Sequence, residues 1–390
     1  MTALLNEFTS TGSKFFAHQT AMEGLRNGKG QPITTHVMLT DICNHSCAFC
    51  SVQARAGDSL DFATVTGYLD ILLNYDLKSV ILSGGGNPIL YRCKKTGKNF
   101  NDVVDAAYAR GLDIGLITNG MPLKPYEGDW DLNLEVFTHR YSWLTVTPRT
   151  LDRLTWIRIS MSGLDHEEKE VFVPDVDRSK TALGFSYVAH DIYDEPADPH
   201  HGKVSRKLDL ISNKNRAPAR TFEERLVQLR KDIQYYTTKF EPRYVRLLPN
   251  CLEPDKIPQR CHQLEAMARV VNFKVNREVC FVQQKPPKAP KACYLGYVHP
   301  VLNCDGYVYP CDSCVLNEAA EHQFANPWRI CKWDQIGKLY ESPVKSLIAD
   351  PAKTCPGCVF STSNGILDDV VSGRIQLGTP SAHHEHVNFV

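Results

Sequence analysis

Three cysteines lie close together in the sequence, Cys43, Cys47 and Cys50, with the spacing CxxxCxxC. Thiolates are soft ligands that suit iron–sulfur clusters and zinc. Three thiolates can hold three irons of a 4Fe–4S cube and leave the fourth iron open to bind another molecule. The alternative is half of a zinc site, but zinc sites usually pair cysteines as CxxC and need a fourth ligand. His45, between the first two cysteines, would fit such a site badly, so the triplet favours iron.

The other cysteines form a second group, far along the chain. Of 14 cysteines in 390 residues, only Cys93 and Cys251 lie between Cys50 and residue 260, and nine lie from Cys261 to Cys358. The N-terminus lacks the charged and apolar pattern of a secretory signal, so disulfides are not expected to explain them. Two cysteine-rich regions in a reducing compartment predict two metal centres.

Hydrophobic patterning predicts alternating strands and helices. Strands are expected at residues 35–40, 80–82, 114–117, 156–160, 184–189 and 244–248. Helices are expected near residues 15–25, 62–73, 103–108 and 134–144, after Asp165, from the capping box at Thr221, and near 261–271. Six strand–helix units imply a parallel sheet with helices outside it, and six are too few to close an eight-stranded barrel. The expected fold is therefore α/β, a partial (β/α)6 barrel followed by a small Cys-rich α+β domain.

Polar and glycine-rich segments follow the predicted strands at the end where parallel barrels carry their chemistry. They are the cysteine loop, Gly84-Gly85-Gly86-Asn87, Thr118-Asn119 and Ser160-Met161-Ser162. Glycines at such a point allow positive φ and close approach of the backbone to a ligand, although a tight turn is an alternative explanation.

The cysteine spacing, with the aromatic Phe49 just before the last cysteine, resembles that of the radical S-adenosylmethionine (radical SAM) superfamily. The resemblance implies a 4Fe–4S cluster on Cys43, Cys47 and Cys50, whose open iron chelates the amino and carboxylate groups of SAM. An electron from that cluster cleaves SAM to a 5′-deoxyadenosyl radical, which abstracts hydrogen from a substrate carbon. The family also has a partly open barrel of the kind expected here.

The same resemblance implies where SAM binds. In this family a Gly-Gly-Glu-Pro segment after the second strand binds the SAM amino group, whereas this chain has Asn87 where an acidic residue is common. Backbone carbonyls could still accept from the ammonium group, with a neutral hydrogen bond from Asn87. The expected cofactor-binding residues are Phe49, Gly84, Gly85, Gly86, Asn87, Thr118, Asn119, Ser160, Ser162, Arg246 and Leu248. Arg158 competes with Arg246 as the cation beside the SAM carboxylate.

The C-terminal cysteines resemble the twitch domain, a shortened relative of the SPASM extension that binds one auxiliary 4Fe–4S cluster. The ligands that this resemblance assigns are Cys293, Cys311, Cys355 and Cys358, with a β-hairpin at 301–309 turning at Asp305-Gly306. Cys314 and Cys331 are alternative ligands, and the rival is a zinc site of Cys311, Cys314, Cys355 and Cys358. The cysteines expected to be buried small hydrophobes are Cys93, Cys251, Cys261, Cys280 and Cys304.

These assignments divide the chain into four parts. They are an N-terminal extension (1–34), the partial barrel (35–284), the auxiliary cluster domain (285–371) after a proline-rich linker, and a polar, His-containing tail (372–390). The tail is expected to be disordered because it is short and polar.

Composition limits the partners. Lys plus Arg equals Asp plus Glu, 44 against 44, so nucleic acid is not an expected partner, and no apolar run predicts a membrane span. The prediction is a cytoplasmic radical SAM enzyme of oxidoreductase type that accepts electrons from a flavodoxin or ferredoxin. Its auxiliary cluster would assist oxidation, epimerisation or cross-linking of a small molecule.

Three alternatives to this function stand. A maturase of ribosomally made peptides ranks second, because only 42 residues precede Cys43, too few for a peptide-recognition domain of about eighty residues. A tRNA or nucleoside substrate ranks third. A metal-binding structural or regulatory protein without SAM cleavage is the alternative from another class.

Overall fold

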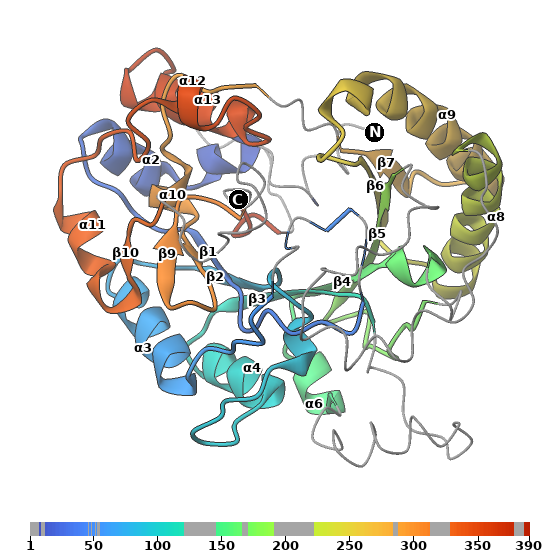
Figure 1. Cartoon of the computed structure of the whole chain (residues 1–390), viewed down its shortest axis with the longest axis horizontal. Coiled ribbons are helices and arrows are strands. Elements are labelled where there is room, and N and C mark those ends of the chain that lie inside the picture. Colours follow the sequence, from blue (N-terminus) through green and yellow to red (C-terminus); the bar gives the residue numbers. More distant parts are fainter. Residues whose placement is uncertain are drawn as a thin grey trace.

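A computed structural model describes residues 8, 12–45, 47, 49–50, 52, 55–120, 146–165, 171–190, 222–283, 288–312, 328–377 and 386–390. Its centre is a ten-stranded sheet in the order β10-β9-β8-β1-β2-β3-β4-β5-β6-β7. Figure 1 shows this sheet as an open curve, with β10 and β7 at its two ends and helices α3, α4, α8 and α9 outside it.

The strands β1 to β7 are all parallel to their neighbours. Their bounds are β1 Thr34–Val37, β2 Ser79–Leu82, β3 Asp113–Thr118, β4 Trp156–Ser160, β5 Ala182–Ala189, β6 Tyr244–Pro249 and β7 Cys280–Val282. The six predicted strands and the partial parallel barrel are therefore confirmed. The strand β7 was not predicted, because three buried residues are too few to show a period.

Helices between these strands cover the outside of the sheet. They are α3 (Phe62–Leu73), α4 (Phe100–Ala109), α6 (Pro148–Leu151), α8 (Phe222–Phe240) and α9 (Ile257–Val275). Their apolar faces pack with the outward residues of the strands into one large core. The helix predicted at 134–144 and the capping residue Thr221 lie outside the described residues.

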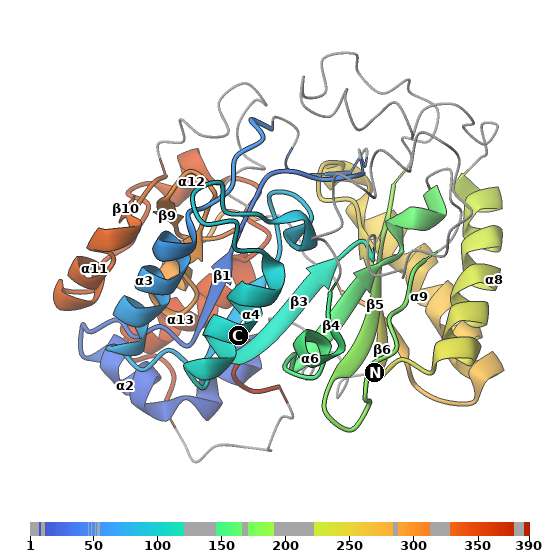
Figure 2. The same cartoon turned by 90° about the horizontal axis from the view of Figure 1, so that it is seen from below.

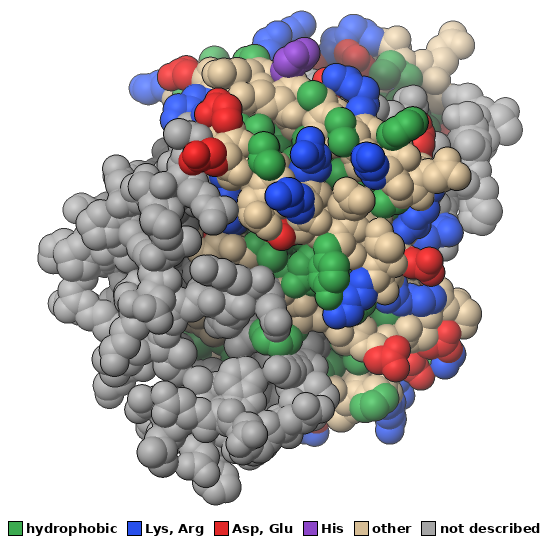
Figure 3. Space-filling model, turned by 90° about the vertical axis from the view of Figure 1, so that its right-hand side faces the viewer, with side chains coloured by type: hydrophobic (Ala, Val, Ile, Leu, Met, Phe, Trp, Pro, Cys, Tyr) green, Lys and Arg blue, Asp and Glu red, His purple; other side chains and the backbone are tan. Residues whose placement is uncertain are grey.

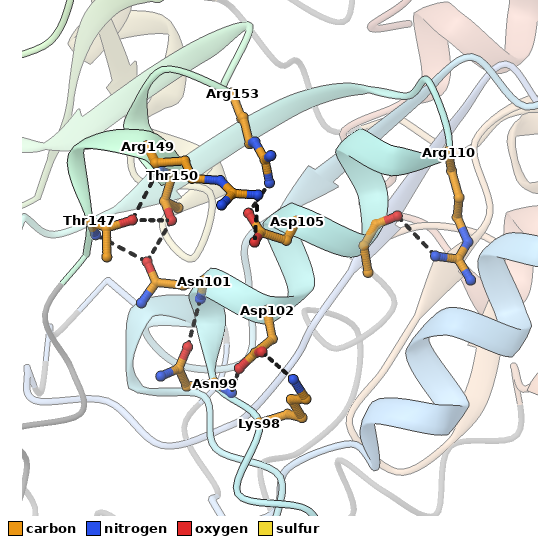
Figure 4. Close-up of polar contacts among 11 residues, drawn as sticks. Lys98, Asn99, Asn101, Asp102, Asp105, Arg110, Thr147, Arg149, Thr150 and Arg153 are labelled. Carbon is orange, nitrogen blue, oxygen red and sulfur yellow. Dashed lines mark hydrogen bonds and ion pairs between the residues drawn. The ribbon is translucent and has the colours of Figure 1, made fainter.

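Side-chain caps fix where α4 begins and how α6 meets it (Figure 4). The Asn99 side chain accepts from the Asn101 N–H, and the Asp102 carboxylate accepts from the Asn99 N–H, which together form a capping box. The Asn101 carbonyl oxygen accepts from the Thr147 N–H and from the Thr150 hydroxyl. These bonds hold the start of α6 against the start of α4.

The C-terminal part of the chain continues the same sheet. Strand β8 (Val301–Leu302) pairs parallel with β1, and β9 (Tyr307–Tyr309) pairs antiparallel with β8. Strand β10 (Cys331–Lys332) then pairs antiparallel with β9. The predicted hairpin at 301–309 is therefore confirmed, and Gly306 in its turn has φ +79°. The sheet crosses the predicted domain boundary at residue 285, and the division into domains stays a prediction.

Helices from both ends of the chain pack together beside β8. The N-terminal η1 (Gly12–Ala17) and α2 (Gln19–Arg26) share an apolar cluster with α10 (Leu295–Val298) and α13 (Ser361–Val371). Two further short helices, α11 (Gly337–Glu341) and α12 (Pro351–Thr354), lie in the same C-terminal part. The helix predicted near 15–25 is thus present as two pieces.

The last five residues lie inside the curve of the sheet, where Figure 1 places the C-terminus. The Phe389 ring is buried against the Trp156 ring, with centroids 5.2 Å apart. The Asn388 carbonyl accepts from the hydroxyls of Thr34 and Ser79, at the starts of β1 and β2. The predicted disorder of the tail is therefore wrong for residues 386–390, because Phe389 packs at the lower end of the barrel and Val390 packs in the cluster of α2, α10 and α13.

Basic and acidic side chains are mixed on the face that carries α8 and α9 (Figure 3). Within the described ranges, no helix combines the length and the apolar character needed to cross a membrane.

Candidate metal centre and cofactor site

The cysteine loop leaves β1 and is closed at its base by Asp41. This carboxylate is fully buried and accepts from the N–H groups of Ala56, Gly57 and Asp58, at 2.6, 3.2 and 2.7 Å. The Thr40 hydroxyl donates to the Asp58 carbonyl at 2.7 Å. The loop therefore starts and ends at one point above the carboxyl end of β1, at the upper side of Figure 2.

The three predicted thiols lie together in this loop, around the guanidinium of Arg55. Its Nη2 donates to the Cys50 sulfur at 3.3 Å, and its Nη1 donates to the His45 carbonyl at 3.1 Å. Burial raises the pKa of the Cys47 thiol, and the neighbouring thiols of Cys50 and Cys43 raise it further. The sequence analysis did not single out Arg55. Its position five residues after the last cysteine is the one signal that could have pointed to it.

In the part of the chain that the structure describes, no three His, Cys, Asp or Glu side chains converge on a point where one ion could bind. All ligands of a zinc ion bind the same metal, whereas each cysteine of an iron–sulfur cluster binds a different iron. The metal held by the three thiols stays a prediction.

The glycine run after β2 makes room for the cysteine loop. A Cβ at Gly86 would lie 1.9 Å from the Ile42 carbonyl oxygen, and one at Gly85 would lie 2.7 Å from the Thr40 carbonyl oxygen. The Gly86 N–H donates to Thr40 at 2.7 Å, and the Asn87 N–H donates to Ile42 at 2.9 Å. The glycines are thus explained by contact with protein backbone, and their contact with SAM stays a prediction. Gly84, the first of the run, has φ +75°.

Asn87 joins a network of side-chain amides that reaches the cysteine loop. Its Nδ2 donates to the Oδ1 atoms of Asn44 and Asn119, at 3.1 and 2.9 Å, and its Oδ1 accepts from the Thr118 hydroxyl at 2.8 Å. The Asn119 amide donates to Asn44 at 3.0 Å and lies 4.0 Å from the Cys43 sulfur. The predicted cofactor-binding residues Asn87, Thr118 and Asn119 therefore connect the ends of β2 and β3 to the segment at the first cysteine.

The ends of β4 and β5 contribute further predicted residues. Buried Ser162 hydrogen-bonds the Cys47 thiol, and the Ser160 hydroxyl donates to Ser162 at 3.3 Å. The Phe49 ring lies 5.0 Å from the ring of His190, which follows β5. The segment before the last cysteine is therefore held over the barrel rather than turned to the outside.

Both candidate arginines, Arg158 in β4 and Arg246 in β6, point to the inner face of the sheet. The residues on either side of them in each strand belong to the core under the helices, so alternation turns both side chains inward. Arg246 donates to the Gln283 side chain at 2.7 Å, and both arginines lie near the Asp312 carboxylate. Leu248, two residues beyond Arg246, is buried on the same face.

The four cysteines assigned to the second site also come together. Burial raises the pKa of the Cys293 thiol, and the thiols of Cys311, Cys358 and Cys355 raise it further. Burial also raises the pKa of the Cys355 thiol, and the thiols of Cys311 and Cys358 raise it further. The Cys293 N–H donates to the Ser346 hydroxyl at 3.0 Å, which fixes one side of this group.

The other cysteines fall outside this group. Cys331 lies in β10, where its charged neighbours are Asp334 and Lys338, and Cys314 lies outside the described residues. The cysteines buried in the core as predicted are Cys93, Cys261, Cys280 and Cys304. Cys251 is only partly buried, because it packs at the edge of the cluster around α10 and α13.

Comparison with known sequences supports the predicted class of protein. No protein-family model matches the chain. An S-adenosylmethionine-dependent nucleotide dehydratase of Selenomonas ruminantium is 27% identical over 131 residues, which cover 33% of this chain. The match spans 46% of that relative, less than half of its length. The resemblance to the radical SAM superfamily, predicted from the cysteine triplet, is thereby confirmed.

Solved structures with a similar backbone arrangement include those of three proteins. SuiB of Streptococcus suis, bound to its precursor peptide SuiA, has a TM-score of 0.44 at 12% identity, over 80% of this chain and 68% of that one. The protein anSMEcpe with bound AdoMet has a TM-score of 0.46 at 13% identity, over 80% of each chain. BtrN in complex with AdoMet and 2-DOIA has a TM-score of 0.31 at 13% identity, over 80% and 88%. With TM-scores below 0.5, these similarities do not bear on the substrate or the reaction.

Proposed function

We propose that the chain is a radical SAM enzyme that acts on a small molecule with the help of an auxiliary 4Fe–4S cluster. One observation carries the proposal. Seven cysteines spread over more than 300 residues gather in two sets, three in the loop after β1 and four near α10, α12 and α13. A SAM-dependent activity agrees with the name of the dehydratase relative, and its nucleotide substrate favours a small molecule over a peptide.

The residues of the first site have separable roles in this proposal. Cys43, Cys47 and Cys50 bind three irons of a 4Fe–4S cluster, which when loaded supplies the electron for cleavage of SAM to a 5′-deoxyadenosyl radical. The Arg55 guanidinium balances part of the negative charge that three thiolates concentrate. The amide network of Asn87 holds the loop in place at Asn44, beside the first ligand. A donor of flavodoxin or ferredoxin type would provide the electron.

The second site assists without binding SAM. Cys293, Cys311, Cys355 and Cys358 supply four thiolates, so a cluster bound there has no open position for a substrate. Its role would be to accept an electron from the substrate radical or to relay one, which favours oxidation, epimerisation or cross-linking.

Iron content tests both sites. We expect about eight irons per chain after anaerobic reconstitution, about four for each cubane. Replacing Cys43, Cys47 and Cys50 together by Ala should leave about four irons and abolish formation of 5′-deoxyadenosine. The control is Cys331→Ala, which should keep all the iron because Cys331 lies apart from both sets. Formation of 5′-deoxyadenosine by the triple variant would overturn the proposal.

A second variant tests whether the two sites have separate roles. Cys355→Ala should still cleave SAM, because the second set contributes no residue to the loop after β1. Product formation should fall while 5′-deoxyadenosine is still made. Loss of SAM cleavage in a folded Cys355→Ala protein would contradict separate roles for the two sites.

A further inference from the structure

The buried guanidinium group of Arg158 and the partly buried one of Arg246 share the inner face of the barrel. Arg158 is 9% exposed. Arg246 lies on the next strand but one, where the register across β5 places it opposite Ser160 and places Tyr244 opposite Arg158. Burial lowers the pKa of Arg246 to about 9, and the neighbouring charge of Arg158 lowers it further. Burial also lowers the pKa of Arg158. Placing two cations side by side away from water is unfavourable unless an anion lies with them.

The described part of the chain supplies only part of that anion. There, the Asp312 carboxylate is the acidic side chain near both arginines, and its side chain is 36% exposed. It also lies 3.8 Å from the ring of His36, so its charge is shared among three basic groups. The Nε atoms of Arg158 and Arg246 are buried and have no hydrogen-bond partner among the described residues. Arg158 also hydrogen-bonds the Tyr244 side chain, but the two Nε donors stay without a partner within the described ranges.

The position of this pair lies between the two cysteine sets. Arg158 is two residues before Ser160 in β4, a rise of about 7 Å, and Ser160 contacts Ser162, which bonds Cys47 of the first set. Asp312 directly follows Cys311 of the second set. Arg246 was predicted at the SAM carboxylate, and that assignment stays a prediction.

We propose that Arg158 and Arg246 bind an oxyanion of the substrate, a carboxylate or a phosphate, on the inner face of the barrel. Guanidinium groups suit both anions because they donate two parallel hydrogen bonds to a pair of oxygens. The assignment to the substrate rests on the proposed function. It deepens that function by naming an anionic substrate held on the inner face of the barrel.

Binding of simple anions tests the site without any SAM chemistry. The full chain would be titrated with inorganic phosphate and, separately, with acetate, at constant ionic strength set with chloride, and binding followed by calorimetry. We expect saturable binding of at least one anion to the unaltered protein. Arg158→Gln and Arg246→Gln should each weaken it about tenfold or more, the effect of losing a charged hydrogen bond. A preference for phosphate or for acetate would identify the anionic group.

Two further variants separate this role from a structural one. Arg153→Gln, which removes an arginine paired with Asp105 outside the barrel, should leave anion binding unchanged. Asp312→Asn should tighten it, because the competing carboxylate is removed. Absence of binding of both anions would overturn the proposal, and so would arginine variants that bind the anion as tightly as the unaltered protein does. So would an Asp312→Asn protein that is destabilised with no gain in anion affinity, since Asp312 would then be the structural partner of the arginines.

The outcome is distinguishable from failure of the proposed function. Anion binding that depends on both arginines, in a protein that never cleaves SAM, would reject the radical SAM activity and keep the anion site. SAM cleavage in a protein whose anion binding does not depend on either arginine would keep the radical SAM activity and reject the anion site.

Discussion

At the scale of single residues, the cysteine loop is positioned by side chains whose chemistry is specific. Asn87 is 3% exposed and both donates and accepts hydrogen bonds, which an amide can do and a carboxylate cannot. The family resemblance places an acidic residue at this position, and the sequence suggested only a modest role for Asn87. The contacts with Asn44, Asn119 and Thr118 instead make it the centre of a buried network.

Replacing Asn87 by Asp tests this role. A buried carboxylate would lose two donated hydrogen bonds and would face the carbonyl oxygens of Asn44 and Asn119. We expect the free energy of unfolding to fall by about 1–3 kcal/mol, and the iron held by the first site to fall as well. Denaturant unfolding and iron analysis would measure the two effects.

The control for this substitution is Asn101→Asp on α4. Asn101 accepts from Thr147 and Thr150 through Oδ1, an acceptor that Asp keeps, so its stability should change little. An Asn87→Asp protein as stable and as iron-rich as the unaltered one would show that the network does not position the loop.

At the scale of elements, two loops support each other at the carboxyl ends of β1 and β2. Gly85 and Gly86 lie against the backbone of residues 40–42, and the N–H groups of Gly86 and Asn87 bond to it. Because both partners are backbone, neither can move aside by changing a rotamer. The geometry of the first site therefore depends on the second loop having glycines, which carry no Cβ, at these positions.

Gly86→Ala should separate these loops. Its Cβ would meet the Ile42 carbonyl oxygen at 1.9 Å, so the cysteine loop must shift. We expect loss of SAM binding and of iron at the first site, with the second set still loaded. The matched control is Gly365→Ala in α13, where a Cβ meets nothing within 4 Å and helix propensity favours Ala by about 1 kcal/mol. Normal SAM affinity in the Gly86→Ala protein would refute this account.

Asp41→Ala should open the base of the same loop. It would leave the N–H groups of Ala56, Gly57 and Asp58 without their acceptor, at a cost of about 1–3 kcal/mol if they stay buried. Amide hydrogen exchange at these three residues should become faster. Unchanged protection would mean that the Thr40 contacts alone close the loop.

At the scale of the whole molecule, the partial barrel has chemistry at one end and packing at the other. The cysteine loop, the amide network and the serines all lie at the carboxyl ends of the strands. Residues 386–390 lie at the opposite end, where Asn388 bonds to the starts of β1, β2 and β3. A substitution at the lower end should therefore change stability without changing the site.

Phe389→Ala tests that separation. Removing a ring that is only 5% exposed should lower the free energy of unfolding by about 3–5 kcal/mol. The rate of SAM cleavage by the folded fraction should stay the same. The control is Phe273→Ala on α9, where the ring is 82% exposed and the expected change is within about 0.5 kcal/mol. Equal stability of the two variants would mean that the last residues are not held under the barrel.

Sequence alone was enough for the features that depend on local pattern. The six strands, the hairpin with Gly306 in its turn and the cysteine triplet follow from residue types a few positions apart. Burial of one face leaves a period in the sequence, and ligands of one cluster leave a short spacing. The four cysteines of the second site were also assigned, by resemblance to a family rather than by a local pattern.

Tertiary structure decided the features that depend on residues far apart. The convergence of Cys293 with Cys355, the turn of Arg158 and Arg246 toward each other, and the burial of Phe389 under β4 each depend on strand register and packing. Asn87 and Arg55 have ordinary sequence neighbours and gain their roles only from Asn119 and Cys50. A side chain's type records what it can bond to, whereas the fold of the whole chain determines which partner comes within reach.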